Sequence, residues 1–223
     1  MTVYIVQFFS ILLMSTSLAC NVVKSSPEIV VIEPVVESPA TAVKGEQTAI
    51  FAGGCFWGVD AVFKHVKGVK DVKSGYSGGE ARTAQYEAVS AGDTGHAESV
   101  KVTFDPTKVT YVQLLTVFFS VAHDPTQLNF QGPDHGTQYR SAIFYTGEEQ
   151  KTLAVQYIDA IKKSKAFSKP VVTEVVPLKA FYEAEDYHQN YLANHPTQPY
   201  IVINDAPKVA DLKKRFPDLY VEK

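Results

Sequence analysis

The sequence predicts an α+β fold, a ferredoxin-like two-layer sandwich with a mixed sheet and a long, largely irregular C-terminal tail. Apolar residues make up 45% of the 223 residues, as in an ordinary globular chain. Their spacing switches repeatedly between the two-residue period of strands and the 3.6-residue period of helices. The resulting order, βα, then ββ, then αβα and a closing strand, fits a mixed sheet with helices on one face better than a doubly wound parallel sheet.

The first half of this pattern begins with a short apolar run at residues 48–52, which predicts a strand. Residues 55–67 follow with apolar side chains at helical spacing, so we expect a helix there. A glycine cluster at 75–79 interrupts the next stretch. Residues 86–91 and 99–104 then read as two further strands.

The second half alternates helices and strands. Residues 109–122 carry an apolar stripe at helical spacing and predict a helix, and residues 139–145 predict a strand. Residues 148–163 again have helical spacing, and residues 171–176 form a β-branched strand. From Pro177 onward, aromatic residues and prolines are frequent, so we expect a tail that wraps the core with little regular structure.

The N-terminal segment has the pattern of an export signal. Residues 1–20 contain no charged side chain, and their apolar run is shorter than the roughly 20 residues that a membrane-spanning helix needs. The end of this segment, Leu18-Ala19-Cys20, resembles a bacterial lipobox. We therefore expect an exported protein of the bacterial cell envelope, either periplasmic or anchored to the membrane through a lipidated Cys20. The alternative is an apolar extension in which Cys20 is incidental.

Residues 21–47 carry three prolines among Ser, Glu and Val, which predicts an extended, flexible linker. Residues 48–223 remain for a single domain, and a chain of that length buries about 70% of its unfolded surface in one core. No internal repeat is present. The chain thus divides into an export segment, a linker and one domain.

Composition excludes several classes of function. Lys and Arg total 21 against 24 Asp and Glu, so the net charge of −3 provides no basic surface for nucleic acid. Two cysteines cannot build a disulfide framework or a Cys-rich zinc module. The six histidines show no HExxH spacing, although His96, His135 and His188 lie in motif-like segments. We therefore expect neither a metal nor another cofactor.

Cys55 lies between a predicted strand and a predicted helix, after Gly53 and Gly54. At a helix N-terminus the first N–H groups are unpaired and the helix dipole is positive. Such a position favours the thiolate and lowers the pKa of a cysteine below its usual value of about 8.5. The sequence therefore predicts a nucleophile at Cys55, and the alternative is a buried structural cysteine.

Five segments in order carry a family resemblance: GCFWG at 54–58, GYSGG at 75–79, TGHAE at 94–98, DHGTQYRS at 134–141 and AEDYHQNYL at 184–192. With this motif set the chain resembles the peptide methionine sulfoxide reductase A family over most of residues 48–200. The resemblance implies a catalytic domain at 48–223 that reduces the S epimer of methionine sulfoxide, free or in proteins, and so repairs oxidised proteins.

The resemblance also implies the roles of five catalytic residues. Cys55 would be the nucleophile, and Glu98 would protonate the sulfoxide oxygen. Tyr86 and Tyr139 would donate hydrogen bonds to that oxygen, and Asp134 would support the polar side of the site. General acid catalysis of this kind typically contributes about 10²- to 10⁴-fold, provided that the pKa of the acid is raised. Taken singly, the tyrosines could be sheet residues and Glu98 a solvated carboxylate.

Substrate binding would fall to aromatic side chains. By the resemblance, Phe56 and Trp57 form an apolar cage for the methyl group of the substrate, and His188 lines the site from the tail. Met lacks the sulfoxide oxygen, so bound product would leave the donors unpaired at roughly 1–3 kcal/mol for each buried group. The competing interpretation is that Phe56 and Trp57 are ordinary core aromatics.

The reaction would leave Cys55 as a sulfenic acid. Many relatives resolve this state with a C-terminal cysteine, but no cysteine follows Cys55 in this sequence. We therefore expect a monomeric one-cysteine enzyme that uses an external thioredoxin-like protein or a small thiol. Two alternatives belong to other classes: a cysteine hydrolase using His96 or His188, and a non-catalytic envelope lipoprotein that binds Met-containing peptides.

Overall fold

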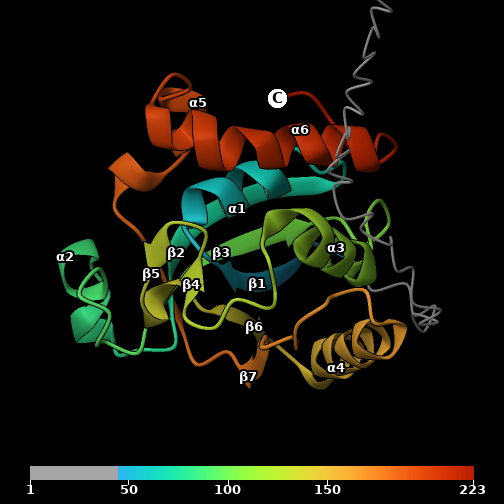
Figure 1. Ribbon diagram of the computed structural model, residues 1–223, viewed down its shortest axis with the longest axis horizontal. Helices are drawn as coiled ribbons and strands as arrows, with labels where there is room; N and C mark the ends of the chain where they lie inside the picture. Colours follow the sequence, from blue (N-terminus) through green and yellow to red (C-terminus); the bar gives the residue numbers. More distant parts are fainter. Residues whose placement is uncertain (1–44) are drawn as a thin grey trace, which may run out of the picture.

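The computed structural model of the protein describes residues 45–223, which form one body around a central sheet (Figure 1). The predicted export segment with Cys20, and the predicted linker up to residue 44, lie outside the described residues. The sheet has six strands in the order β7-β6-β1-β3-β2-β8. The bounds of these strands are β1 Gln47–Gly53, β2 Val69–Ser77, β3 Ala97–Phe104, β6 Ser141–Tyr145, β7 Glu174–Pro177 and β8 Phe181–Glu183.

The four central strands have the predicted sandwich topology. Neighbours in β6-β1-β3-β2 are all antiparallel, and helical segments connect β1 to β2 and β3 to β6. The outer strand β7 pairs parallel with β6, whereas β8 pairs antiparallel with β2. The prediction of an α+β fold with a mixed sheet is therefore confirmed.

One face of the sheet carries the helices. The longer helices are α1 Phe56–Lys64, α3 Tyr111–Val117, α4 Glu148–Ser164 and α6 Ala206–Arg215. In β1, Ala49 and Phe51 contribute to the same buried cluster as α1, α3 and α4, while Ile50 and Ala52 face a smaller cluster on the other side. This alternation is the two-residue period of a strand, so β1 is buried on both faces.

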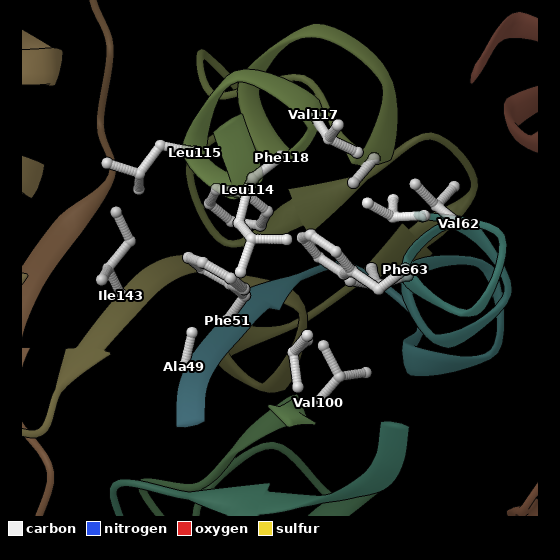
Figure 2. Packing of buried hydrophobic residues seen from close by; sticks show 14 of the residues in the cluster. Ala49, Phe51, Val62, Phe63, Val100, Leu114, Leu115, Val117, Phe118 and Ile143 are labelled. Carbon is white, nitrogen blue, oxygen red and sulfur yellow. The ribbon is translucent and has the colours of Figure 1, made fainter. Parts of the chain in front are cut away.

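Aromatic stacking forms the centre of the main core. The ring of Phe51 on β1 lies 5.1 Å from the ring of Phe63 on α1 and 4.9 Å from that of Phe118 after α3. Figure 2 shows Leu114 beside these rings, with Val100 and Ile143 contributed by neighbouring strands. The core therefore joins β1 to α1 and to the segment that follows α3.

One predicted element in the middle of the chain was wrong, and one strand was not predicted. The predicted strand 86–91 is a short helix, α2 (Tyr86–Val89), which begins where the Tyr86 N–H donates to the Glu185 carboxylate at 2.9 Å. The partner of β3 is instead β2, a nine-residue strand that runs into the start of the glycine cluster and ends at Ser77. Gly75 belongs to this strand, and Tyr182 and Phe181 of β8 pack so closely against it that a Cβ would not fit. The start of α2 thus depends on Glu185, which lies 99 residues from Tyr86 in the sequence.

The tail contains more regular structure than the sequence predicted. After β8 come α5 (Tyr191–Asn194), a π-helical turn (Ile201–Asp205) and α6, which lies along α1 (Figure 1). The predicted helix 109–122 likewise becomes α3 followed by a π-helical segment (Phe118–Ala122). No helix within residues 45–223 is long and apolar enough to cross a membrane.

The core can be tested at Leu114, which is fully buried among the rings shown in Figure 2. Leu114→Ala removes buried methyl groups and leaves a cavity, so we expect a loss of about 2–5 kcal/mol in the free energy of unfolding. Urea denaturation measures this loss. Val155→Ala, on the exposed side of α4, is the control and should change the free energy by less than about 0.5 kcal/mol. Equal effects of the two variants would contradict the assigned core.

Candidate active site

The turn between β1 and α1 places Cys55 at the N-cap of the helix. Gly54 has a φ of +88°, a left-handed conformation that favours glycine. The Cys55 side chain is 8% exposed and is free of any disulfide in the described part of the chain. The predicted position at a strand-to-helix turn is therefore confirmed, and the sulfur faces a nearly closed environment.

Glu98 reaches this turn from β3. Its Oε2 accepts the N–H of Phe56, the first residue of α1, at 3.0 Å. The carboxyl group is 3% exposed, and burial raises the pKa of Glu98 to about 8. The side chains of Cys55 and Glu98 also interact directly. Glu98 is therefore a buried acid that keeps its proton at neutral pH, beside the only described cysteine.

The expected lowering of the Cys55 pKa was wrong. Burial raises the pKa of the thiol well above its usual value, and the nearby carboxylates of Glu98 and Asp205 raise it further. A backbone hydrogen bond from Trp57 acts in the opposite direction but does not prevail. The position at the helix N-terminus is correct, but desolvation of the thiolate outweighs the helix dipole. Cys55 is therefore a thiol in the free protein.

The two phenols and Asp134 converge on the same point from separate segments. Tyr86 begins α2, Tyr139 ends a 3-10 turn (Thr137–Tyr139), and Asp134 lies in the two-residue strand β5 (Asp134–His135). Burial raises the pKa of both tyrosines, and the nearby Glu98, Asp134 and Cys55 raise it further. Both phenols therefore remain hydrogen-bond donors, and the structure brings the five predicted catalytic residues together.

The predicted aromatic pair follows Cys55 on α1. Phe56 is fully buried, whereas Trp57 is partly exposed and stacks on Tyr191 with ring centroids 3.6 Å apart. The indole N–H of Trp57 donates to Nδ1 of His188 at 3.1 Å. His188 is only 2% exposed, and its ring lies 5.0 Å from that of Phe56. His188 therefore holds Trp57 through a hydrogen bond and packs against Phe56.

Three further residues of the site come from the tail and were missed by sequence reasoning. Tyr200 donates to the Asp134 carboxylate and lies edge-on to Trp57, with centroids 5.9 Å apart. Tyr191 stacks on the same indole. Asp205 is fully buried against Gly58 of α1, where it leaves no room for a Cβ. Tyr191 lies within the AEDYHQNYL segment that carried the resemblance, and the abundance of aromatic residues in the tail was the signal for Tyr200, whereas no signal pointed to Asp205.

A pocket of about 320 Å³ opens at Cys55 and is lined in part by Asp134 and Tyr200. No group of three His, Cys, Asp or Glu side chains in residues 45–223 could hold a metal ion. The imidazole of His96 is bound to backbone groups, with Nδ1 accepting from the Gly79 N–H at 3.2 Å and Nε2 lying 3.0 Å from the Glu80 carbonyl. Because His188 is bound to Trp57, neither imidazole proposed for a cysteine hydrolase pairs with Cys55.

Comparison with known proteins agrees with this geometry. The sequence pattern of the family "Peptide methionine sulfoxide reductase" matches residues 47–219. Peptide methionine sulfoxide reductase MsrA 2 of Mesorhizobium japonicum is 62% identical over 182 residues, which cover 82% of this chain and 93% of the relative. The chain belongs to the peptide methionine sulfoxide reductase family.

Further relatives of this methionine sulfoxide reductase extend the comparison. MsrA 2 of Synechocystis is 51% identical over 191 residues, covering 85% of this chain and 89% of the relative. Methionine sulfoxide reductase A of Corynebacterium diphtheriae superposes with a TM-score of 0.60 at 34% identity, covering 70% of this chain and 77% of that one. Reduced Mxr1 of Saccharomyces cerevisiae superposes with a TM-score of 0.63 at 33% identity, covering 69% of this chain and 87% of that one. The resemblance carried by the five sequence segments is therefore confirmed.

The raised pKa of Glu98 makes the stability of this reductase depend on pH. The pKa of Glu98 is about 8 in the folded state and about 4.3, the usual value for Glu, in the unfolded state. Between these two pH values the folded state keeps a proton that the unfolded state has released. The free energy of unfolding therefore falls as pH rises through this window, by up to about 1.4 kcal/mol per pH unit. Glu98→Gln keeps an acceptor for the Phe56 N–H but cannot ionise. We expect the melting temperature of the variant, relative to wild type, to increase from about pH 5 to about pH 8.

Thermal unfolding of both proteins across this pH range measures the effect. The exposed Glu87→Gln is the matched control and should follow wild type. Melting curves of Glu98→Gln and wild type that shift in parallel with pH would show that Glu98 ionises normally.

Proposed function

We propose that this chain reduces the S epimer of methionine sulfoxide in peptides and in the free amino acid, with Cys55 as nucleophile and Glu98 as acid. The observation that carries the proposal is the buried, protonated Glu98 carboxyl beside the Cys55 thiol. Reduction of a sulfoxide needs both a nucleophile for sulfur and a proton for oxygen. The membership of the chain in the peptide methionine sulfoxide reductase family supports the same activity.

In the first step the sulfur of Cys55 attacks the sulfoxide sulfur as the Glu98 proton passes to the sulfoxide oxygen. The Cys55 thiol proton moves to the Glu98 carboxylate, which restores the acid. The bond between the two sulfurs then breaks as the hydroxyl group passes from the substrate sulfur to the Cys55 sulfur, which leaves methionine and a Cys55 sulfenic acid. A resting thiol with a raised pKa suits this scheme, because the charged thiolate arises only while its proton has an acceptor.

The two sides of the site account for selectivity between epimers. Glu98, Tyr86 and Tyr139 lie on the polar side, and their donors hold the oxygen. On the apolar side, the ring of Phe56 packs against Tyr76 and that of Trp57 lies edge-on to Tyr200, and the proposal assigns the methyl group to this side. The R epimer exchanges the places of oxygen and methyl, so its oxygen would face the aromatic wall and leave buried donors unpaired.

The sulfenic acid needs electrons from a second molecule. Residues 56–223 contain no cysteine, so the proposed reductant is external, a thioredoxin-like protein or a small thiol. A first thiol displaces water and forms a mixed disulfide with Cys55, and a second thiol releases Cys55 as a disulfide leaves. The proposal includes action as a monomer.

The location of the enzyme is a proposal from the sequence. The uncharged residues 1–20 and the lipobox-like Leu18-Ala19-Cys20 support export to the cell envelope, with Cys20 as a lipid anchor. Residues 21–47 would then be the tether that allows the reductase to reach damaged envelope proteins. Repair of oxidised methionine outside the cytoplasm is the role that fits this arrangement.

The activity is tested by mixing the protein with excess methionine S-sulfoxide in the absence of reductant. We expect about one methionine per enzyme and one added oxygen on Cys55 by mass spectrometry, because the cycle stops at the sulfenic acid. Cys55→Ser should give neither product, and the R epimer is the control substrate. Turnover of the S epimer by Cys55→Ser would overturn the assignment of the nucleophile.

The same mass spectrum tests the external reductant. We expect no intramolecular disulfide, and turnover that depends on added thioredoxin or small thiol. A disulfide between Cys20 and Cys55 in the mature enzyme would replace this part of the proposal.

Export and anchoring are tested by the N-terminal mass of protein purified from a bacterial host. We expect residues 1–19 to be absent and Cys20 to carry lipid, because a lipobox cysteine becomes the new N-terminus. Cys20→Ser is the matched variant and should lose the lipid mass. A full-length, unmodified N-terminus would exclude both export cleavage and anchoring.

A further inference from the structure

The Gly53-Gly54 turn before Cys55 is enclosed on two sides by side chains from one later segment. A Cβ on Gly53 would lie 2.8 Å from Cγ of His123, and a Cβ on Gly54 would lie 2.6 Å from Cβ of Gln131. Both side chains also line the pocket at Cys55. We name His123 and Gln131 together the diglycine clamp.

His123 is tied to the sheet by a chain of neutral hydrogen bonds. Its Nδ1 lies 3.0 Å from the carbonyl of Phe118, which can only accept, so Nδ1 carries the proton. Burial lowers the pKa of His123 to about 4, so the imidazole is neutral and Nε2 accepts from Ser141 Oγ at 2.7 Å. Thr173 in turn donates to Ser141 at 2.7 Å. Ser141 pairs directly with Gly53 across β6 and β1, so the imidazole bridges the turn to its neighbouring strand.

Gln131 is held by both atoms of its amide. Its Oε1 accepts the N–H of Asp124 at 3.2 Å, and its Nε2 donates to the Asp124 carbonyl at 2.6 Å. Asp124 follows His123 directly in the chain, so the two members of the clamp are tied together. Gln131 also pairs with Asp134 across the β4–β5 hairpin, where β4 spans Phe130–Gln131. The clamp thus connects the Cys55 turn to a residue of the polar side of the site.

The geometry points to His123 and Gln131 as positioning residues, which hold the Gly53-Gly54 turn and set the place of the Cys55 sulfur relative to Glu98 and Asp134. Neither residue needs to touch the substrate for this role. A small displacement of a nucleophile is costly, because a shift of about 1 Å reduces the rate of a reaction by about 10²-fold. A turn built from two glycines has little rigidity of its own, so its position must be imposed by its neighbours.

Gln131→Met tests the clamp, because methionine keeps an aliphatic chain against Gly54 but removes both hydrogen bonds to Asp124. We expect the rate of methionine formation in a single turnover without reductant to fall about tenfold, with little change in substrate affinity. The pH profile of Cys55 alkylation by iodoacetamide should also change. The rate should rise at a lower pH than in wild type, because the sulfur moves away from Glu98 and toward solvent. A purely structural role would lower the melting temperature but leave this pH profile unchanged.

The matched control is Gln150→Met on α4. The Gln150 amide also makes two backbone hydrogen bonds: it accepts the Thr146 N–H at 3.1 Å and donates to the Thr48 carbonyl at 2.7 Å, but it does not line the pocket at Cys55. We expect its rate to stay within about twofold of wild type and its alkylation profile to match that of wild type. Equal losses in Gln150→Met and Gln131→Met would overturn the clamp, as would a wild-type profile in Gln131→Met.

Two additions keep the outcome decisive. If Gln131→Met does not fold, Gln131→Leu removes the same two hydrogen bonds without adding a charge near Cys55, and the same criteria apply. Ser141→Ala removes the donor to His123 and should shift the alkylation profile in the same direction as Gln131→Met. The rate of methionine formation rests on the proposed function, whereas the alkylation profile does not. Wild-type protein that forms no methionine would refute the proposed function, and the alkylation profile alone would then test the clamp.

Discussion

The hydrogen bond from the Phe56 N–H to the buried Glu98 carboxyl is the interaction on which the site depends. It joins the first residue of α1 to β3 and places an acid beside the residue that precedes the helix. A helix N-terminus usually attracts a charged carboxylate. Here burial prevails, and the carboxyl keeps its proton. A carboxyl group that binds the start of a helix is thus protonated at neutral pH.

The same burial determines the state of Cys55. A thiolate would be stabilised by the helix N-terminus, but it would have to share a nearly closed space with Glu98 and Asp205. Three acidic groups in one region of low dielectric cannot all be charged. The free protein therefore holds protons at Cys55 and Glu98, and the protons move when the reaction supplies an acceptor. Such an arrangement protects the thiol from unproductive oxidation, since the thiolate is the reactive form.

Sequence patterns were sufficient for the class of fold and for most elements with a strong period. They were insufficient where a distant partner decides. Tyr86 begins a helix because Glu185 binds its N–H, and β2 continues into a glycine cluster as far as Ser77 because β8 pairs with it and packs closely against Gly75. In these two cases local propensity is weak, and tertiary contact outweighs it. The helix α6 differs, because Ala206–Arg215 consists mostly of good helix formers with a Pro in the first turn. Its sequence therefore carried a helical signal that the expectation of an irregular tail overlooked.

The sequence by itself determined the family, the cysteine that stands at the start of a helix, and the absence of any later cysteine. These are properties of residue type and order, which folding does not change. Only the tertiary structure decided the ionisation of Cys55 and Glu98, the support of Trp57 by His188 and Tyr191, and the enclosure of the diglycine turn by His123 and Gln131. These depend on burial and on contacts between residues that are distant in the chain, and a linear sequence records neither.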